Sequence, residues 1–280
     1  PQKKPVADAK QVSGAAPADI FSGQAEYELV QDKARLKAWI AEAAEAGIVA
    51  VDTETTSLNA MRAELVGVSM SIKPGRACYI PVAHSAPEAQ ASLDLGLGEG
   101  DAPKAKDGIK QIKRDDAVKM LKPLLEDPTV LKIGHNVKYD AEIFAHYGVE
   151  VAPVDDTMLV SYVLEGGLHG HGMDDLAELH LGHQTIKFKE VAGSGKAQMT
   201  FDQVPLDKAL DYAAEDADIT CRLHRLLKPR LAREHMVSIY EVMERPLIGV
   251  LAAMERTGIR VEPRVLKDLS ADFAGRLADL

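Results

Sequence analysis

The sequence predicts an α/β fold, in which a mixed β-sheet comes first along the chain and helices lie around and after it. Three observations lead to this prediction. An apolar run at 48–53 ends in polar residues, as expected of a central strand that is covered on both faces. Two alternating segments then flank a Pro-Gly pair at 74–75, which indicates a hairpin. From residue 138 onward, apolar residues recur mainly at helical spacing.

The individual elements follow from local signals. A helix is expected after Asp32, which is a good N-cap residue, with Gly47 as its stop. Pro123 is expected to kink or shorten a later helix, because proline cannot donate a backbone hydrogen bond. The expected strands are 25–30, 48–53, 64–73, 76–82 and 130–133, and the expected helices are 32–46, 116–125, one from about 138, 156–164, 174–181 and 206–231.

Two stretches are not expected to belong to the core. Residues 1–23 are rich in Pro, Ala, Lys and Gly and contain few large apolar side chains, which is typical of a flexible linker. Residues 84–114 combine Gly, Pro, Ala, Lys and Asp, and we expect an extended loop of unknown role there. Because the chain does not begin with Met, we expect it to come from a longer protein.

Composition excludes several classes of protein. The 280 residues contain two cysteines, Cys78 and Cys221, without CxxC spacing, which argues against a zinc knuckle and a disulfide scaffold. The apolar stretch at 246–254 is too short to span a membrane. The chain carries 33 Lys+Arg and 43 Asp+Glu, a net charge of −10, and the acidic excess lies before residue 222. We therefore expect weak electrostatic binding of nucleic acid by this region alone.

Acidic residues stand where an α/β sheet places its ligands. Asp52 and Glu54 end the apolar strand, and their i, i+2 spacing puts both carboxylates on one face at its carboxyl end. Taken alone, this pair also fits a strand-end turn with solvated acids. Asn136 and Asp140 follow the next strand at i, i+4, although Asn136 also fits an ordinary N-cap.

A third pair lies inside the long C-terminal helix. Tyr212 and Asp216 are again at i, i+4, so the phenol and the carboxylate rise from one face. Four acids on separate elements converge only if cations neutralise their repulsion. Oxygen ligands without His or Cys favour Mg²⁺ or Mn²⁺. Two such ions about 4 Å apart can stabilise both the attacking and the leaving oxygen in a phosphoryl displacement.

The order of the motifs D-x-E, N-x-x-x-D and Y-x-x-x-D resembles the exonuclease motifs of the DEDD superfamily, in the variant with Tyr in the third motif. Residues 24–232 are similar to the proofreading domain of bacterial DNA polymerase I, and 244–259 to the opening of the family A polymerase domain. The resemblance implies a ribonuclease-H-like (DnaQ-like exonuclease) fold and 3′→5′ hydrolysis of single-stranded DNA to dNMPs. The intervening segments that carry it are 155–159, 173–177, 199–201 and 212–219.

The resemblance also implies roles for the site residues. By that likeness, Asp52, Glu54 and Asp216 bind a first metal ion, and Asp52 and Asp140 hold a second. Tyr212 orients the attacking water. The ions are expected to be Mg²⁺ or Mn²⁺, with Zn²⁺ able to replace them in vitro.

Four further residues match substrate-binding positions of the family. Leu58 matches an apolar wedge between the last two bases, although a core Leu fits the sequence equally well. Phe201 matches an aromatic residue that stacks on or packs against the single strand. Asn136 and Tyr139 match residues that line the same cleft, and a packing role fits Tyr139 equally well.

We expect three regions: a linker at 1–23, a 3′→5′ exonuclease domain at 24–232, and the beginning of a polymerase domain at 233–280. The last consists of one helix followed by a strand, so the polymerase active site lies outside this chain. The resemblance implies a monomer of the bacterial cytoplasm, associated with the nucleoid, that binds a single-stranded 3′ end and reaches primer-template DNA through the polymerase domain.

Two alternatives remain open. A ribonuclease D-like exonuclease carries the same acids and would prefer RNA. An inactive exonuclease fold could serve as a structural or DNA-binding module, although such folds typically lose the acids. His169, His171, His180 and His183 look like a ligand cluster, but without a zinc-finger spacing we interpret them as histidines of a loop and a helix surface.

Overall fold

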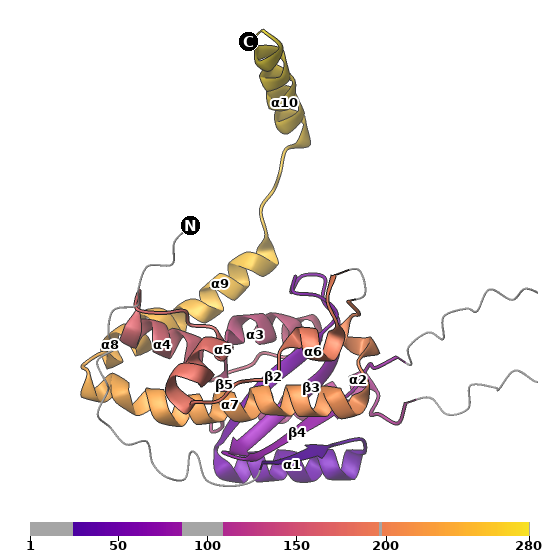
Figure 1. Cartoon of the computed structure of the whole chain (residues 1–280), viewed down its shortest axis with the longest axis vertical. Helices are drawn as coiled ribbons and strands as arrows, with labels where there is room; N and C mark the ends of the chain where they lie inside the picture. Colours follow the sequence, from indigo (N-terminus) through magenta and orange to yellow (C-terminus); the bar gives the residue numbers. More distant parts are fainter. Residues whose placement is uncertain (1–24, 86–108, 196–197, 280) are drawn as a thin grey trace, which may run out of the picture.

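The predicted α/β fold is confirmed by a six-stranded mixed sheet with helices on both faces (Figure 1). The computed structural model describes residues 25–85, 109–195 and 198–279, so the expected linker and most of the expected loop at 84–114 lie outside the described residues. The strand order is β1-β4-β3-β2-β5-β6. β3 runs antiparallel to its neighbours β2 and β4, whereas the other pairs are parallel. The strands are β1 (Glu26–Leu29), β2 (Ile48–Thr55), β3 (Leu65–Lys73), β4 (Arg76–Pro81), β5 (Leu131–Gly134) and β6 (Val154–Asp156).

The helices largely follow the sequence signals. The Asp32 side chain caps the first helix by accepting from the Arg35 backbone, and Gly47 ends that helix in the left-handed conformation. Pro123 does not end its helix, which continues for two residues beyond it. The helices are α1 (Lys33–Ala46), α2 (Arg114–Leu125), α3 (Val137–His146), α4 (Thr157–Glu165), α5 (Met173–Leu176), the π-helix η2 (Ala177–Leu181), α6 (Phe188–Ala192), the 3-10 helix η4 (Phe201–Gln203), α7 (Leu206–Arg233), α8 (Val237–Ile239), the π-helix η5 (Tyr240–Glu244), α9 (Arg245–Thr257) and α10 (Pro263–Ala278).

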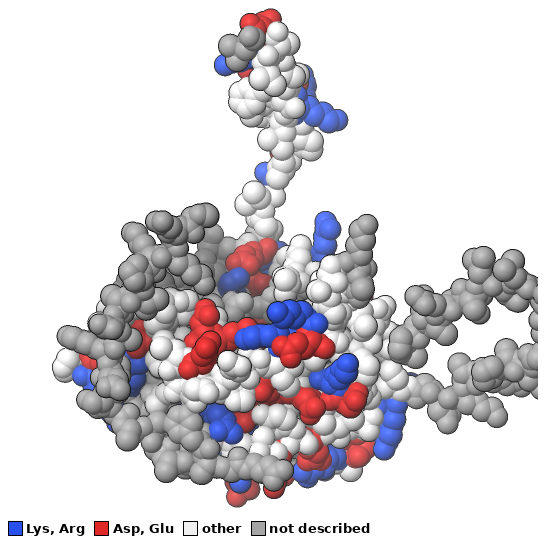
Figure 2. Space-filling model, viewed as in Figure 1, with Lys and Arg blue, Asp and Glu red and all other residues white. Residues whose placement is uncertain are grey.

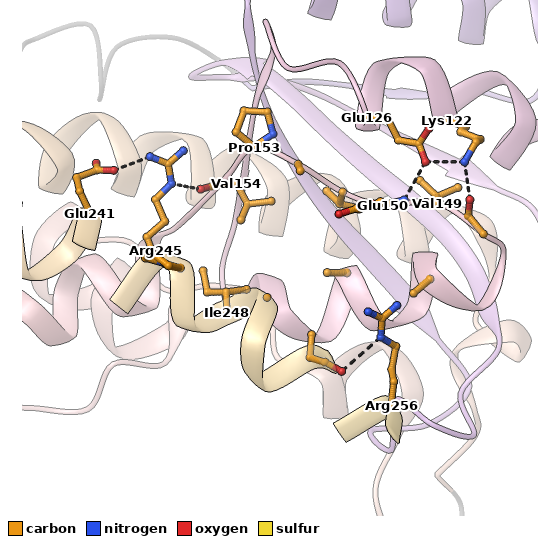
Figure 3. A pocket seen from close by; sticks show the side chains of 18 residues that line it. Lys122, Glu126, Val149, Glu150, Pro153, Val154, Glu241, Arg245, Ile248 and Arg256 are labelled. Carbon is orange, nitrogen blue, oxygen red and sulfur yellow. Dashed lines mark hydrogen bonds and ion pairs between the residues drawn. The ribbon is translucent and has the colours of Figure 1, made fainter. Parts of the chain in front are cut away.

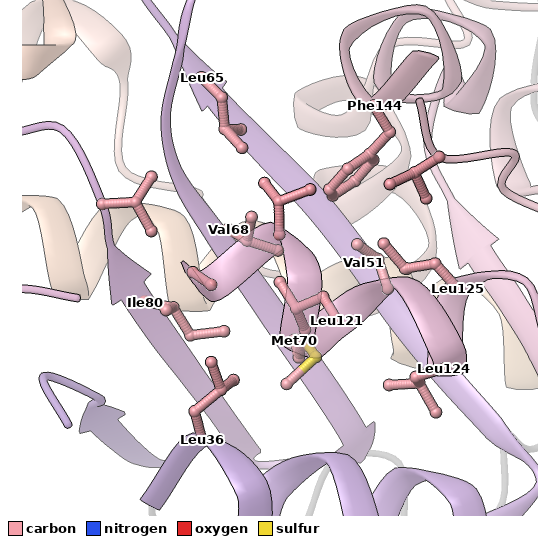
Figure 4. Packing of buried hydrophobic residues seen from close by; sticks show 14 of the residues in the cluster. Leu36, Val51, Leu65, Val68, Met70, Ile80, Leu121, Leu124, Leu125 and Phe144 are labelled. Atoms are coloured by element: carbon pink, nitrogen blue, oxygen red, sulfur yellow. The ribbon is translucent and has the colours of Figure 1, made fainter. Parts of the chain in front are cut away.

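The main hydrophobic core lies between one face of the sheet and helices α1, α2 and α3. Alternate residues of the central strands point into it, because side chains at i and i+2 share a face. Figure 4 shows these side chains meeting those of α2 and α3. The largest contributors are Leu36, Val51, Leu65, Val68, Met70, Ile80, Leu121, Leu124, Leu125 and Phe144. This core fixes β2 and α3, which carry three of the four expected acids.

The opposite face of the sheet is covered by the long helix α7 (Figure 1). The buried side of α7 consists largely of small residues, including Ala209, Ala213 and Ala217. The sheet presents small residues in turn, including Ala50 and Ser69, both fully buried. Small side chains allow a helix to approach a sheet closely, so α7 can bring its own polar residues to the carboxyl end of β2.

The C-terminal helices differ from the prediction. The strand expected after α9 is wrong, since the exposed residues 258–262 form no strand and lead directly into α10. A strand needs a partner, and no strand of the described chain pairs with this segment. α10 stands apart from the body in Figure 1 and has no buried residue. Within the described residues, no helix has both the length and the apolar character needed to cross a membrane.

α9 docks onto the α/β body next to a groove of about 820 Å³ (Figure 3). The Arg245 side chain donates to the Val154 carbonyl at 2.7 Å and pairs with Glu241 at 2.6 Å. Tyr240 is fully buried and donates its hydroxyl to Asp155 at 3.1 Å. None of the four expected acids lines this groove, so it is separate from the candidate active site.

Candidate active site

The central strand β2 places Asp52 and Glu54 on the face that α7 covers. Asp52 lies opposite Ser69 and Glu54 opposite Gly67 on β3. A Cβ atom at Gly67 would lie 2.1 Å from the hydroxyl of the buried Tyr79, so glycine is needed there for the close approach of that ring. Glu54 is 7% exposed, so burial strongly affects its charge.

Asp140 reaches the same end of β2 from helix α3. Its Oδ1 atom accepts from the Thr53 backbone N–H at 3.0 Å and from the Thr53 hydroxyl at 2.5 Å. Asp140 is 4% exposed. Thr53 thus fixes the carboxylate of a residue 87 positions away in sequence.

The start of α3 is held by Asp156, at the end of β6. Its carboxylate accepts from the backbone N–H groups of Asn136 at 3.1 Å and Val137 at 2.9 Å, and it also caps α4 through Met158 at 2.8 Å. The alternative of an ordinary side-chain cap by Asn136 does not hold: this residue occupies the N-cap position with a φ of 64°, but its side chain makes no capping hydrogen bond within the described residues. One buried carboxylate instead sets the start of both helices.

α7 contributes Tyr212 and Asp216. One carboxylate oxygen from each of Asp52, Glu54 and Asp216 lies within 4.8 Å of the others, which is close enough for one ion to bind all three. Asp140 is not part of this group of three. It nevertheless lies next to them, because its carboxylate accepts two hydrogen bonds from Thr53, which stands between Asp52 and Glu54 on β2. The structure thus brings together the four acids that the sequence singled out.

These carboxylates are destabilised as anions. Burial raises the pKa of Asp52 to about 7, and a hydrogen bond from the Thr53 backbone opposes that shift. Burial and the neighbouring acids raise the pKa values of Glu54, Asp140 and Asp216 well above their ordinary range. A cation among these oxygens would remove both penalties, because it restores favourable interactions to the charged form.

The unsatisfied atoms of the site fit such a cation. Glu54 Oε1 is buried and has no hydrogen-bond partner among the described residues. Each unpaired buried oxygen of this kind costs free energy unless a donor or an ion meets it. Oxygen donors alone, with no imidazole or thiolate in the group, suit the hard ions Mg²⁺ and Mn²⁺. The acids present therefore fit divalent metal binding.

Tyr212 stands beside the acids. Burial, followed by the charges of Asp216, Glu54 and Asp52, raises its pKa far above the usual value, so the phenol keeps its proton at neutral pH. Its ring packs against Phe188 at a centroid distance of 6.2 Å. A neutral phenol held in this position can donate to or orient an oxygen at the metal site.

Leu58 and Tyr139 lie on the loop and helix at the rim of the site. The Leu58 side chain is 99% exposed, which excludes the alternative of a core leucine. The Tyr139 hydroxyl hydrogen-bonds the Thr55 hydroxyl and the Ser57 carbonyl, so it anchors the loop that carries Leu58. Tyr139 therefore has a packing role, and its partly exposed ring borders the site.

The expectation that Phe201 stacks on or packs against the single strand does not fit its buried position. Phe201 is 1% exposed and lies among Tyr79, Phe188 and Tyr212, with the Tyr212 ring at 5.8 Å. No face of its ring is free for a nucleobase. Phe201 supports the ring of Tyr212 from beneath, a role that its motif could not distinguish from stacking.

Two residues that position the site were not singled out from the sequence. Thr53 is the middle residue of the D-x-E motif, and its backbone N–H and hydroxyl both donate hydrogen bonds to Asp140. Asp156 lies in a segment quoted only for its family likeness, and a carboxylate capping two helices leaves no periodic signal.

Figure 2 shows Lys and Arg interspersed with Asp and Glu over the visible described face, not gathered into a basic patch.

Comparison with known proteins identifies the region that carries this site. A family model described as 3'-5' exonuclease matches residues 27–232. A curated relative, the DNA polymerase I of Rhizobium leguminosarum, is 47% identical over 290 residues, which covers 96% of this chain and 28% of that protein. The chain spans between a quarter and a third of the length of the first curated relatives it matches.

Solved structures share the fold. The POL domain of Pol1 from M. smegmatis, in complex with DNA primer-template and dNTP, superimposes with a TM-score of 0.65 at 21% identity, covering 90% of this chain and 36% of that chain. Escherichia coli RNase D superimposes with a TM-score of 0.57 at 15% identity, covering 82% of this chain and 51% of that chain. The expected ribonuclease-H-like fold is thereby confirmed.

Proposed function

Because the chain belongs to the family of 3′→5′ exonuclease domains found in bacterial DNA polymerase I, we propose that it removes nucleotides one at a time from the 3′ end of single-stranded DNA. The observation that supports this proposal best is the group of carboxylates from β2 and α7, within 4.8 Å of one another and destabilised by burial. That arrangement is suited to hydrolysis of a phosphodiester with divalent ions.

In the proposed site, Asp52, Glu54 and Asp216 hold one ion, and Asp52 and Asp140 hold a second. When bound, the ions activate a water and stabilise the attacking and leaving oxygens of the phosphoryl displacement. The chain supplies the positions of these groups: β2 presents two acids on one face, Thr53 fixes Asp140, and α7 brings Asp216 to them.

Tyr212 and Leu58 act on the substrate side. The protonated Tyr212 phenol orients the attacking water by donating or accepting a hydrogen bond. The exposed Leu58 enters between the last two bases of the strand, where an apolar side chain can replace part of a base stack. Asn136, exposed at the start of α3 with a left-handed backbone, lines the same side of the cleft.

We propose Mg²⁺ as the ion in the cell, with Mn²⁺ able to replace it. The product would be dNMPs, and the domain would act as a monomer on 3′ ends in the bacterial cytoplasm, near the nucleoid. Residues 233–280 would begin a polymerase domain that delivers primer-template DNA to this site. The polymerase I relatives support DNA over RNA as the substrate, since one of them matches 96% of this chain at 47% identity, whereas a ribonuclease D of Shewanella matches only 50% of it at 33% identity.

The test is degradation of a 5′-fluorophore-labelled single strand, as DNA and as RNA of one sequence, with and without Mg²⁺. We expect a ladder shortened from the 3′ end of the DNA, lost with a chelator and in Asp216→Asn. Asp207→Asn is the matched control, because Asp207 is an exposed acid on the same helix. Preference for RNA would favour the ribonuclease D-like alternative, and equal cutting by Asp216→Asn would refute the site.

A further inference from the structure

A second group of metal-binding side chains lies on the helical side of the molecule, away from the acids of β2. Glu165 ends α4, His169 lies in the loop that follows, and His180 lies in η2. One ligand atom from each lies within 4.8 Å of the others. His169 lies in a loop, as expected, but the side chains of His169 and His180 are only 21% and 12% exposed, so both are more buried than the surface interpretation implies.

Both imidazoles turn toward one oxygen. Glu165 Oε2 lies 2.7 Å from His169 Nε2 and 3.2 Å from His180 Nε2. The other carboxylate oxygen, Oε1, lies 2.8 Å from an Arg230 guanidinium nitrogen on α7. In the described part of the chain, His180 Nε2 is buried and makes no aligned hydrogen bond, despite its distance of 3.2 Å to Glu165. Its ring nitrogen therefore faces the group without a donor or acceptor that satisfies it.

The contacts of the two His169 ring nitrogens also bear on whether a cation binds here. Its Nδ1 atom lies 2.6 Å from the Gly170 carbonyl, which can only accept, so Nδ1 carries a proton. In a neutral ring, Nε2 would then direct its lone pair at the Glu165 carboxylate, which is repulsive at 2.7 Å. A second proton on the ring would turn this contact into a charge-assisted hydrogen bond, and a metal ion bound by both atoms would also remove the repulsion. A ligating histidine typically donates its other N–H to a carbonyl in this way.

The charges around the group match a divalent ion. Glu165 and Glu234 both contact Arg230, and Asp175 lies close enough to act electrostatically on His169. Three carboxylates against one guanidinium leave two negative charges, which one divalent ion would neutralise. Arg230 would then hold the second oxygen of the ligating carboxylate, as groups outside the direct ligands commonly do.

We propose that Glu165, His169 and His180 form a second metal site, separate from the catalytic one, that takes Zn²⁺ in preference to Mg²⁺. Two imidazole nitrogens and one carboxylate oxygen are ligands that suit zinc, with water in the fourth position. The ion would join α4, the loop 166–172 and η2, and Arg230 would connect the three to α7. His171 and His183 are bound instead to Ser161 and Glu215.

The test uses the whole chain with Asp52→Asn and Asp216→Asn, which removes the oxygen-ligand site as a competing zinc site. After chelation and dialysis, Zn²⁺ is added in excess Mg²⁺, and bound zinc is measured by native mass spectrometry and by competition with a chromogenic chelator. We expect one zinc per chain. His169→Gln and His180→Gln should each weaken binding by at least about tenfold, since even outer-shell changes cost about that much.

His146→Gln is the matched control, because His146 is an exposed histidine on α3 outside the group. Co²⁺ gives a second readout: its visible absorption should appear in the parent chain and disappear in both ligand variants. Far-ultraviolet circular dichroism verifies that the variants fold. If the chain with Asp52→Asn and Asp216→Asn and all its histidines binds no zinc in excess Mg²⁺, a proton holds the group together and the proposal fails. It also fails if zinc binding is unchanged in both His169→Gln and His180→Gln.

Discussion

Replacing Thr53 by Val tests whether the β2 hydroxyl positions the fourth acid. The substitution removes the hydrogen bond at 2.5 Å from the Thr53 hydroxyl to Asp140 and leaves the backbone bond at 3.0 Å in place. Valine has nearly the same shape as threonine, and Thr53 is 7% exposed, so the packing is preserved. The change therefore isolates one hydrogen bond to a buried carboxylate.

A hydrogen bond to a charged group contributes about 1.5–3 kcal/mol. If Asp140 must stay fixed in the transition state, losing that bond lowers kcat/KM by about 10- to 150-fold, at about 1.4 kcal/mol per factor of ten. A second consequence concerns pH. Burial and Asp52 raise the pKa of Asp140, and the two Thr53 bonds lower it. Thr53→Val raises that pKa further, so the acid limb of the pH–rate profile moves to higher pH.

The assay is the initial rate of 3′→5′ degradation of single-stranded DNA over a range of pH and Mg²⁺ concentration. Thr53→Ser retains the hydroxyl and should keep most of the activity, whereas Thr53→Val should lose it and require more Mg²⁺. Unchanged kcat/KM in Thr53→Val would show that the backbone bond alone positions Asp140. Equal loss in the Ser and Val variants would point to packing, and the hydrogen-bond argument would be refuted.

Three further predictions concern stability and substrate contact. The pKa of Asp52 is raised from 3.8 to about 7 in the folded state, so between these values the folded chain binds more protons than the unfolded chain. The metal-free chain should therefore lose thermal stability as pH rises from about 4 to 7, and saturating Mg²⁺ should reverse the loss. A melting temperature of the metal-free chain that does not change with pH would contradict this. Asp156→Ala removes the caps of two helices and should lower the free energy of unfolding by about 1–4 kcal/mol, measured by urea denaturation, whereas exposed Asp211→Ala should change it little. Leu58→Ala should change the free energy of unfolding by less than about 0.5 kcal/mol yet slow the cutting of DNA, because Leu58 is 99% exposed. Phe201→Ala should lower the free energy of unfolding by about 3–5 kcal/mol, because Phe201 is buried. A clear loss of stability in Leu58→Ala would contradict the exposure of Leu58.

Much of the fold was accessible from the sequence because its signals are local. The α1 caps Asp32 and Gly47, the apolar run of β2 and the hairpin of β3 and β4 each depend on a few neighbouring residues. β6 was missed because three residues are too few for a periodic pattern. The strand after α9 was expected from likeness to a larger domain, but pairing depends on a partner that the described chain does not provide.

The same distinction between local signals and long-range packing applies to the candidate site. Asp52 and Glu54 could be singled out because they end an apolar run, and Asp140 and Asp216 because they complete motifs whose order resembles that of a known family. The burial of Phe201 and the exposure of Leu58 could not be predicted, since either residue type occurs both in cores and at binding surfaces. The position of Phe201 depends on long-range packing of α6, α7 and η4, and that of Leu58 depends on a loop anchored by Tyr139 of α3. Neither arrangement leaves a pattern within a single segment.

Net charge is the property on which structure changes the interpretation most. The value of −10 argues against strong electrostatic binding of DNA. Part of that charge, however, lies on buried carboxylates whose raised pKa values show that they are unfavourable as anions without a cation. Divalent ions at the four acids would remove negative charge at the point where the scissile phosphate must approach. DNA affinity of this domain should therefore depend more steeply on Mg²⁺ than on the number of its basic residues, and a DNA-binding isotherm that is insensitive to Mg²⁺ would contradict this.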